Sequence, residues 1–487
     1  MATWYRSIRL SFSRISAVFA LLAGTGILAG CNTGAVHFGG AQGATASVTV
    51  SMTSTADTPP TGVSVLSLQV TITDARLNPG SVELLAGPVT VDISRLKTET
   101  SLLSTLNVTP GTYTSIALTV ASNPSLTFEN NSGSTLTAGG TPCANGAICK
   151  AGLALAGNSQ SIALPGAGVT LTASTPTALL LNVSLTDLLA DSAGTLSMNL
   201  GASGALSAAQ ITSAGTPFES IEDVVGVVSG PANNTFTLQT ALGNYSLAVN
   251  SSTQFVNFPT TVCTSVGFSC LASSEIVSVN MSLQTDNTLL ATDVFFEDAN
   301  SSVPEIEGVV VGNSGLPAQF SMVVLQETPA GSGPALGSEV SVALNATPFG
   351  IDNLVGTTNT SHFSFAGTSD LIVGQEVQVQ QGTGSTASVI NANRVLLRSS
   401  RITGTVSTTA FPNFDMNGLP PFLQGASPAI TQILVETATT FTPNGTEVGG
   451  SVSVLTQIQA GRSLSARGQL FANSGSPTLL AGRVVEH

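Results

Sequence analysis

The stretch Val63-Ser-Val-Leu-Ser-Leu-Gln-Val-Thr-Ile72 decides the fold class of this chain. Valine, leucine and isoleucine recur in it at about every second position, which is typical of a β-strand with one face in a core. Residues 47–52 and 89–93 show the same alternation. Clusters of proline and glycine that favour turns separate these stretches, at residues 59–60, 78–80 and 109–111.

Helical periodicity is scarce along the whole chain. Residues 94–106 place four leucines loosely at helical spacing, which favours one short helix between strands. Residues 186–193 form the other candidate helix. Because the rest of the chain has the pattern of strands and turns, we predict an all-β protein.

The tetrapeptide Leu28-Ala-Gly-Cys31 resembles the lipobox of exported bacterial lipoproteins. It follows three arginines and an apolar run over residues 15–30, and no Asp or Glu precedes Cys31. The resemblance implies cleavage before Cys31 and acylation of the new amino terminus, which anchors a protein without spanning the bilayer. The alternative is an uncleaved signal anchor, although the run is shorter than the ~20 residues of a spanning helix. We therefore expect residues 1–30 to be a signal peptide, and residues 31–46 to be the lipidated cysteine and a flexible Gly-rich tether.

The charge pattern argues against nucleic acid as a partner. From Cys31 onward the chain has ten Lys and Arg residues against 27 Asp and Glu, and no Lys or Arg lies between Lys150 and Arg394. Binding to nucleic acid or to an anionic membrane surface depends on basic side chains near phosphates. The chain is also 42% hydrophobic and only 8% charged, which argues against disorder. Its 457 mature residues suggest about three domains or more, at ~150 residues each.

Four cysteines besides Cys31 form two local pairs. Cys143 and Cys149 are six positions apart, Cys263 and Cys270 are seven apart, and each pair encloses a glycine that lets the chain fold back. We predict the two local disulfides among the three connectivities that four cysteines allow. Export into an oxidising compartment favours them. Zinc is the alternative, but the spacings are wider than usual for zinc ligands and histidine partners are missing.

The segment from Val89 to Leu96 and the hairpin from Gly111 to Leu118 resemble a bacterial domain of unknown function, family 4382. That family joins an apolar strand and an Asp-Leu-Leu segment to a Gly-x-Tyr-x-x-Ile-x-Leu hairpin, and it is typical of exported lipoproteins. The resemblance implies a β-sandwich over residues 47–217. Gly111 permits the turn, and we expect Tyr113 to pack its ring and pair its hydroxyl.

The chain departs from this family in one later strand. The family has acidic residues there in a Leu-x-Leu-Asp-x-Asp-Leu pattern, whereas this chain has Asn182 and Ser184 within residues 179–185. This puts an acidic ligand role in doubt. We expect a plain edge or core strand instead.

Beyond residue 218, four landmarks recur three times in the same order. They are a glycine in a strand, a Thr-x-Phe step or its variant, an alternating strand, and an alanine followed three residues later by a valine. The copies contain Gly226, Phe255, Val277, Ala291 and Val294; Gly308, Phe349, Val377, Ala392 and Val395; and Gly404, Phe441, Leu464, Ala481 and Val484.

These repeats resemble another bacterial domain of unknown function, family 5666, whose members look like small barrels of the oligonucleotide/oligosaccharide-binding (OB) type. The recurring glycine fits a strand that bends to close a barrel. We predict an N-terminal β-sandwich followed by three small β-barrel-like (OB-like) modules at residues 218–300, 301–399 and 400–487. We expect the modules to fold separately, like beads on a string, with junctions near residues 299–304 and 399–401 that lack strand patterning.

Residues that could carry catalysis are few. His362, near Ser361 and Asp352, is the only imaginable triad, but a lone histidine in a loop of serines is usually just solvated. The motifs of zinc proteases, esterases, phosphate-binding loops and calcium loops are missing from the sequence. We predict that the chain is not an enzyme and uses no cofactor.

The acidic and aromatic residues do not identify a binding site more clearly than the histidines identify a catalytic one. Glu219, Glu222 and Asp223 lie at one predicted junction, and Glu297 and Asp298 lie at another. Calcium binding is one interpretation, and solvated linker charge is the favoured one, so we expect no metal. Stacking on sugars favours exposed Trp or Tyr. The mature chain has no Trp and two Tyr, and we expect its Phe residues mainly in cores.

The sequence thus predicts a lipid-anchored protein of the bacterial cell envelope with a non-enzymatic binding or structural role. Its partners would be the membrane, through the anchor, and an envelope glycan or protein. Because Asn32 and not Asp follows Cys31, we expect the outer membrane if the organism has one. The alternatives are capture of a glycan or hydrophobic ligand for uptake and, less favoured, an envelope hydrolase.

Overall fold

The computed structural model describes residues 45–486 except for short internal stretches. These stretches are residues 55–57, 174, 212–217, 241–242, 260–262, 264, 285, 287, 299–302, 330, 352–362, 411–412, 418–420, 425–431, 443–457 and 473–476. Cys31, the tether up to residue 44, and the imagined triad around His362 lie outside the described residues. No helix in the described part of the chain is both long and apolar enough to cross a bilayer.

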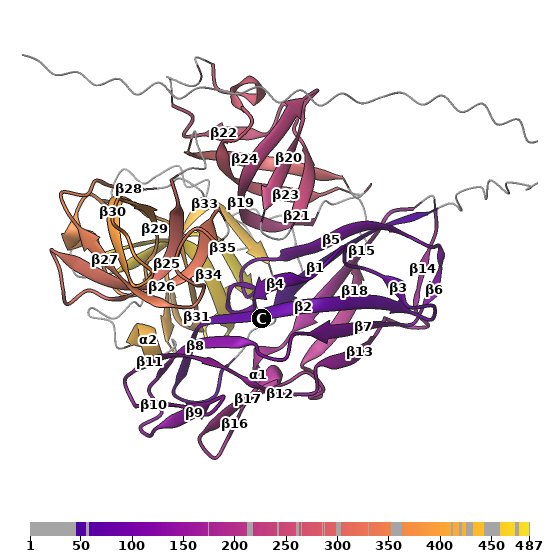
Figure 1. The fold of residues 1–487 in the computed structure, drawn as a ribbon, viewed down its shortest axis with the longest axis horizontal. Helices are drawn as coiled ribbons and strands as arrows, with labels where there is room; N and C mark the ends of the chain where they lie inside the picture. Colours follow the sequence, from indigo (N-terminus) through magenta and orange to yellow (C-terminus); the bar gives the residue numbers. More distant parts are fainter. Residues whose placement is uncertain are drawn as a thin grey trace, which may run out of the picture. The chain divides into compact units, whose positions relative to one another are not determined.

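The first domain contains two large sheets, which Figure 1 draws mainly in indigo and purple. One has the strand order β18-β15-β1-β5, and the other has the order β11-β8-β2-β7-β13 with β3 and β4 also paired to β2. Their bounds are β1 (Ala46–Ser54), β2 (Val63–Asn78), β3 (Val82–Glu83), β4 (Val89–Asp92), β5 (Ser101–Val108), β7 (Ser115–Val120), β8 (Ser125–Asn130), β11 (Ile148–Gly152), β13 (Ser159–Ala163), β15 (Thr177–Val183) and β18 (Leu206–Ile211).

Two smaller sheets complete this domain. They have the orders β10-β9-β17-β12, with β16 on β17, and β14-β6. Their strands are β6 (Gly111–Tyr113), β9 (Leu136–Ala138), β10 (Thr141–Cys143), β12 (Ala154–Ala156), β14 (Val169–Leu171), β16 (Leu189–Ser192) and β17 (Thr195–Asn199).

One hydrophobic core joins the two large sheets. Val50 of β1 and Ile72 of β2 are 1% exposed, and both belong to the same buried cluster. Alternating strands bury one face in this way because successive side chains point to opposite sides. Leu179 and Leu181 of β15 are fully buried between neighbouring strands β1 and β18. The sandwich prediction is confirmed, and residues 179–183 form an internal core strand.

Residues 218–486 form three five-stranded barrels with one topology. Each barrel has the strand order 1-2-3-5-4 and closes through a pairing of its first and fourth strands, and its third and fifth strands are parallel. This is a small closed barrel of the predicted OB-like kind. Figure 1 colours the first barrel pink, the second orange and the third yellow.

The strands of the first barrel are β19 (Phe218–Ala232), β20 (Thr235–Thr240), β21 (Gly243–Ala248), β23 (Ile276–Leu283) and β24 (Leu289–Asp298), with the short β22 (Gln254–Val256) on β24. Those of the second are β25 (Glu305–Gly312), β26 (Gln319–Thr328), β27 (Glu339–Leu344), β29 (Glu376–Gln381) and β30 (Val389–Leu397), with β28 (Phe349–Ile351) on β30. Those of the third are β31 (Ser399–Ala410), β32 (Asn413–Asn417), β33 (Gln432–Thr442), β34 (Ser463–Phe471) and β35 (Thr478–Glu486).

The recurring landmarks occupy equivalent places in the three barrels. The glycine of the first strand pairs with the same position of the fourth strand: Gly226 with Val277, Gly308 with Val377, and Gly404 with Leu464. The phenylalanine pairs with the valine of the last strand: Phe255 with Val294, Phe349 with Val395, and Phe441 with Val484. The residues that repeat in the sequence therefore mark equivalent strand pairings in the three barrels.

Close packing explains the recurring glycine. A Cβ atom on Gly308 would lie 2.3 Å from the carbonyl oxygen of Val323, and one on Gly226 would lie 2.7 Å from that of Gln239. Both distances are too short for any side chain, so the first strand approaches the second closely at this point.

Two predicted helices are mostly strand. Residues 94–106 contain only the 3₁₀ turn η1 (Ile93–Arg95) before β5 begins, and residues 186–193 contain the single turn α1 (Leu185–Leu188) followed by β16. In the first case β5 pairs with β1 along the large sheet. Tertiary pairing thus overrides a leucine spacing that fits a helix only loosely. The other short helical turns are η2 (Phe268–Cys270), η4 (Thr368–Asp370) and α2 (Pro421–Gln424).

The predicted junction at residues 399–401 is a buried strand. β31 begins at Ser399, one residue after Arg398, and Ser399 and Ser400 are 2% and 0% exposed. Ser400 accepts a hydrogen bond from the backbone N–H of Glu376, with an N–O distance of 2.9 Å. The expectation of an unpatterned linker was wrong here, because the polar residues pair inside the protein instead of facing water.

Candidate functional site

Within the described residues, five arginines and five glutamates form a largely buried charge network that joins the sandwich to the barrels. Arg398 is 1% exposed, and its guanidinium lies 2.7 Å from Glu297 of the first barrel and 3.4 Å from Glu307 of the second. Such burial is tolerated only when each charge is paired. Only 8% of the residues of this chain are charged, and ten of them belong to this network. The members are Arg95, Arg394, Arg398, Arg401, Arg467, Glu99, Glu297, Glu305, Glu307 and Glu376.

Arg95 and Glu99 carry the network into the sandwich. Arg95 lies at the end of η1, 3.4 Å from Glu99 and 3.3 Å from Glu307 of the second barrel. Glu99 also pairs with Arg401 and, at 3.4 Å, with Arg467, both from the third barrel. The carboxylate of Glu99 thus forms ion pairs with arginines from two domains, the sandwich and the third barrel.

Glu305 lies at the edge of this network, beside Glu297. It accepts from Arg394 at 2.8 Å and from the amide of Gln378. Burial and the negative charge of Glu297 raise the pKa of Glu305 to about 8, and Arg394 opposes this rise only in part. The charge of Glu305 therefore changes near neutral pH.

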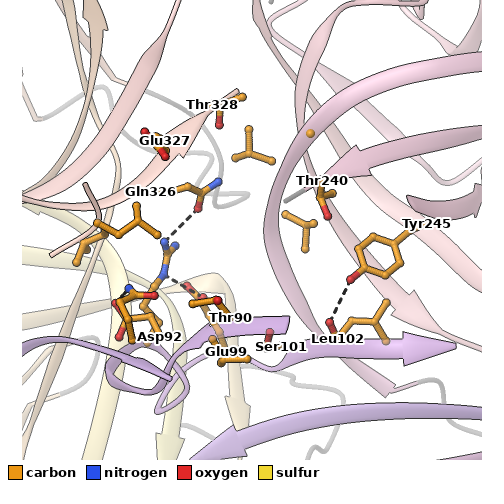
Figure 2. A pocket seen from close by; sticks show the side chains of 18 of the residues that line it. Thr90, Asp92, Glu99, Ser101, Leu102, Thr240, Tyr245, Gln326, Glu327 and Thr328 are labelled. Carbon is orange, nitrogen blue, oxygen red and sulfur yellow. Dashed lines mark hydrogen bonds and ion pairs between the residues drawn. The ribbon is translucent and has the colours of Figure 1, made fainter. Parts of the chain in front are cut away.

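A cavity of about 560 Å³ opens beside Arg95, where the sandwich and the first two barrels meet. Figure 2 shows Gln326 and Glu99 on one side and Tyr245 on the other. Arg95 bonds to both Gln326 and Glu99. The volume of the cavity lies in the range of small-molecule sites. The lining combines polar groups with apolar ones; the apolar ones are Leu102, Val224, Val225, Met281, Leu325 and Leu336.

Tyr245 fixes the first barrel to the sandwich at the wall of this cavity. Its hydroxyl donates to the backbone oxygen of Leu102 at 3.2 Å, and the residue is 7% exposed. Burial raises the pKa of Tyr245 to about 12, so the hydroxyl stays protonated and remains a donor at neutral pH. Ser101, next to Leu102, lines the same cavity.

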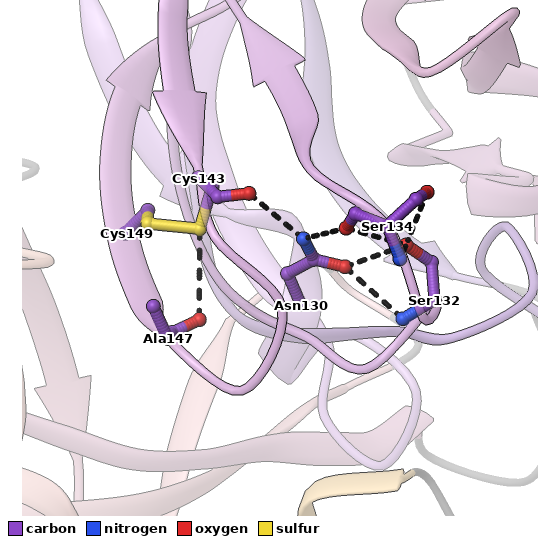
Figure 3. The surroundings of a disulfide bond; sticks show 6 residues. All are labelled: Asn130, Ser132, Ser134, Cys143, Ala147 and Cys149. Atoms are coloured by element: carbon purple, nitrogen blue, oxygen red, sulfur yellow. Dashed lines mark hydrogen bonds between the residues drawn. A yellow bond between two sulfur atoms is a disulfide. The ribbon is translucent and has the colours of Figure 1, made fainter.

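Both predicted disulfides are present, Cys143 with Cys149 and Cys263 with Cys270. Figure 3 shows the first one beside Asn130. The amide nitrogen of Asn130 donates to the backbone oxygens of Cys143 (2.9 Å) and Ser134 (2.8 Å), which ties the disulfide hairpin to β8. These two disulfides fit an oxidising compartment.

The acidic residues of the predicted junctions occupy strands. Glu297 is 4% exposed and paired with Arg398, and the neighbouring Asp298 accepts from Gln380 at 3.0 Å. The favoured interpretation of solvated linker charge was therefore wrong for Glu297. The backbone of Glu219, Glu222 and Asp223 lies in β19. Within the described residues, no group of three or more His, Cys, Asp and Glu side chains is arranged to hold a metal ion.

Tyr113 and Asp92 of the sandwich serve the structure. Tyr113 is 4% exposed and its hydroxyl donates to the backbone oxygen of Thr109 at 2.7 Å, as predicted. Asp92 caps η1 by accepting from the backbone N–H of Ser94 and also accepts from the Ser67 hydroxyl at 2.7 Å. Tyr113 lies outside the charge network, whereas Asp92 lines the cavity and its charge acts on Arg401 of the network.

Sequence reasoning missed the charge network. One signal for it was present, because Arg394, Arg398 and Arg401 lie within eight residues, next to a stretch of more than 200 residues without Lys or Arg. Their glutamate partners come from segments near residues 99, 297, 307 and 376. Only the folded chain brings these segments together.

Comparison with protein families and with curated proteins finds no match. Among solved structures, the chain is similar to drosophila Unr CSD456, at 9% identity over 54% of this chain and 95% of that chain, with a TM-score of 0.13. It is also similar to a multidomain protein with nucleic acid binding domains from Streptococcus pneumoniae, at 10% identity over 53% and 72% of the two chains, with a TM-score of 0.10. TM-scores this low support no conclusion about function. The resemblances to families 4382 and 5666 stay predictions.

Proposed function

We propose that this chain is a lipid-anchored protein of the bacterial cell envelope that binds a small ligand without transforming it. The observation that carries the binding role is the cavity between the sandwich and the first two barrels. Its walls hold both apolar side chains and fixed polar groups, which is the usual composition of a ligand site. An amphipathic ligand fits this lining best.

The charge network supports binding over catalysis at this site. Besides Asp92 and Glu327, the cavity wall carries the charged pair of Arg95 and Glu99. These two are bonded to each other, and Arg95 also contacts Glu307 and Gln326. A general base needs a carboxylate poised to accept a proton from substrate, whereas Glu99 is surrounded by three arginines. The ion pairs of Glu99 with these arginines hold the wall of the cavity in place.

Capture of a glycan or hydrophobic ligand for an uptake system is the second candidate. It uses the same cavity and differs only in the fate of the ligand. The membrane anchor at Cys31 serves either role, because it keeps the protein in the envelope where the ligand occurs.

Replacement of Cys31 by Ser tests the anchor. The variant cannot be acylated at this position, so we expect either release into the soluble exported fraction or an uncleaved precursor. Fractionation and immunoblotting of cells that produce the full chain would measure this, with Ser192→Ala as the matched control. Membrane attachment of a processed Cys31→Ser chain would contradict the lipoprotein assignment.

Filling the cavity tests the binding role. We expect a small molecule to co-purify with the full chain extracted in native lipid particles, and mass spectrometry would detect it. Ser101→Phe places a ring at the cavity wall and should remove that molecule, whereas Ser192→Phe, on an exposed strand of the sandwich, should retain it. The binding role fails if no molecule co-purifies with the wild-type chain, or if Ser101→Phe retains it.

A further inference from the structure

A second hollow, of about 570 Å³, lies on the first barrel alone, apart from the cavity described above. It is formed by the turn between β19 and β20 and by the connection from β21 to β23. Its lining contains no Asp, Glu, Lys or Arg. The residues that line it are Asn234, Val249, Asn250, Ser251, Thr253, Gln254, Phe255, Val266, Gly267 and Phe268.

Two phenylalanine rings are half-buried at this hollow. Phe255 and Phe268 pack against the barrel core from its edge, and Val266 beside them is 59% exposed. Most phenylalanines were expected in cores, and these two are exceptions. A partly exposed ring offers an apolar face to a ligand while its other face is supported by the protein.

Rigid elements hold both rings. Phe255 lies on β22, which pairs with β24, and the hydroxyl of Thr253 donates to the backbone oxygen of Ala291 at 2.7 Å. Phe268 begins η2, and the disulfide between Cys263 and Cys270 closes the loop that carries it. A site on rigid elements binds with little ordering cost.

The polar groups at the hollow are amides and a hydroxyl. The Oδ1 atom of Asn250 accepts from the backbone N–H and the hydroxyl of Ser252, at 2.8 and 2.6 Å, and the Nε2 atom of Gln254 donates to the Ser252 backbone oxygen at 3.1 Å. These bonds orient both amides, so that a donor nitrogen on Asn250 and an acceptor oxygen on Gln254 remain. Asn234 and Ser251 are exposed and add further donors and acceptors.

We propose that this hollow binds a neutral oligosaccharide. Sugar hydroxyls both donate and accept hydrogen bonds, which matches amide and hydroxyl side chains, and the C–H face of a sugar ring packs on aromatic faces. A charged ligand would lose its hydration without meeting an opposite charge. The proposal goes beyond the cavity between the domains, because it uses a different site, on the first barrel alone.

Isothermal titration of the full chain in detergent tests the proposal, with maltohexaose, cellohexaose and chitohexaose as neutral probes and hexagalacturonate as the charged one. We expect at least one neutral hexasaccharide to bind and hexagalacturonate not to bind. Asn234→Ala and Phe268→Ala should each weaken that binding at least tenfold. Asn234 is exposed, so its substitution keeps the test valid if Phe268→Ala does not fold.

Two controls separate this site from the rest of the protein. Val389→Ala removes the other large exposed apolar side chain of the described residues, on the second barrel, and should leave the affinity unchanged. Ser101→Phe fills the cavity between the domains and should also leave the affinity for the hexasaccharide unchanged. The proposal for this hollow and the proposal for the cavity can therefore fail separately. The proposal is overturned if none of the three neutral probes binds, if hexagalacturonate binds as tightly, or if Asn234→Ala binds like the wild type.

Discussion

At the scale of single residues, burial of charge is the main feature of this protein. Arg398 and Arg467 are among its largest fully buried side chains, in a chain where only 8% of residues are charged. Buried ion pairs contribute little net stability compared with apolar packing, but loss of one partner costs about 3–5 kcal/mol. The pairs therefore specify which domains meet and in what register, more than they add to the free energy of unfolding.

Glu305 gives this network a pH dependence. Its pKa is about 8 in the fold and near 4.5 when unfolded. Between these values the folded protein holds a proton that the unfolded chain has lost, so the contribution of Glu305 to stability is fully present below pH 4.5 and falls as the pH rises to 8. The substitution Glu305→Gln keeps the shape of this side chain but removes its titratable carboxyl group. We expect it to reduce the loss of stability between pH 5 and 8, by up to ~1.4 kcal/mol per pH unit.

Urea unfolding at several pH values measures this difference. Glu339→Gln, an exposed carboxylate on the same barrel, is the matched control and should keep the wild-type slope. Equal slopes for wild type and Glu305→Gln would show that Glu305 is ionised in the fold, contrary to the expected pKa.

At the scale of elements, the sequence repeat corresponds to hydrogen bonding between specific strands. The threonine before each landmark phenylalanine bonds to the landmark alanine in two barrels: Thr253 to the backbone oxygen of Ala291 at 2.7 Å, and Thr347 to that of Ala392 at 2.9 Å. These residues are about 40 positions apart in sequence. They recur together because each pair closes the same corner of its barrel.

Helix predictions failed at this scale for a physical reason. Leucine spacing over residues 94–106 reports only local periodicity, whereas β5 is stabilised by its pairing with β1. Leu102 and Leu103 of β5 are both buried although neighbours on a strand point to opposite faces. Leu103 lies in the sandwich core, and Leu102 packs against the first barrel. A strand that is buried on both faces loses the alternation that would have identified it.

At the scale of the whole molecule, the second and third barrels share buried residues. Phe471 and Leu480 of the third barrel belong to the core cluster of the second, and their exposures are 1% and 0%. The Gln375 amide nitrogen donates to the backbone oxygen of Leu470 at 2.9 Å across the same contact. Full burial of one such side chain contributes about 1.5–3 kcal/mol.

This sharing changes what we expect from excision of the third barrel. The sequence predicts that residues 400–487 fold alone. Because Phe471 and Leu480 lose their partners in the second barrel on excision, we expect residues 400–487 to melt well below residues 301–487, and the longer fragment to melt in one transition. Circular dichroism and calorimetry of the two fragments measure this.

The fragment of residues 218–300 is the control, since its strands close a barrel without residues from the third. If residues 400–487 melt at the same temperature alone and in the longer fragment, the barrels are independent beads and the shared residues add no cooperativity.

The β-sandwich and the barrel shape of the repeats were implied by the resemblances to families 4382 and 5666. The sequence by itself determined the all-β class, the threefold repeat with its register landmarks, and the pairing of Cys143 with Cys149 and of Cys263 with Cys270. These features depend on local alternation, on repetition and on short loops, which a sequence displays directly. Only the tertiary structure decided the buried charge network and both hollows. Their residues come from distant segments, such as Glu99 and Arg401, and a charged side chain has the same identity in the sequence whether it faces water or a buried partner.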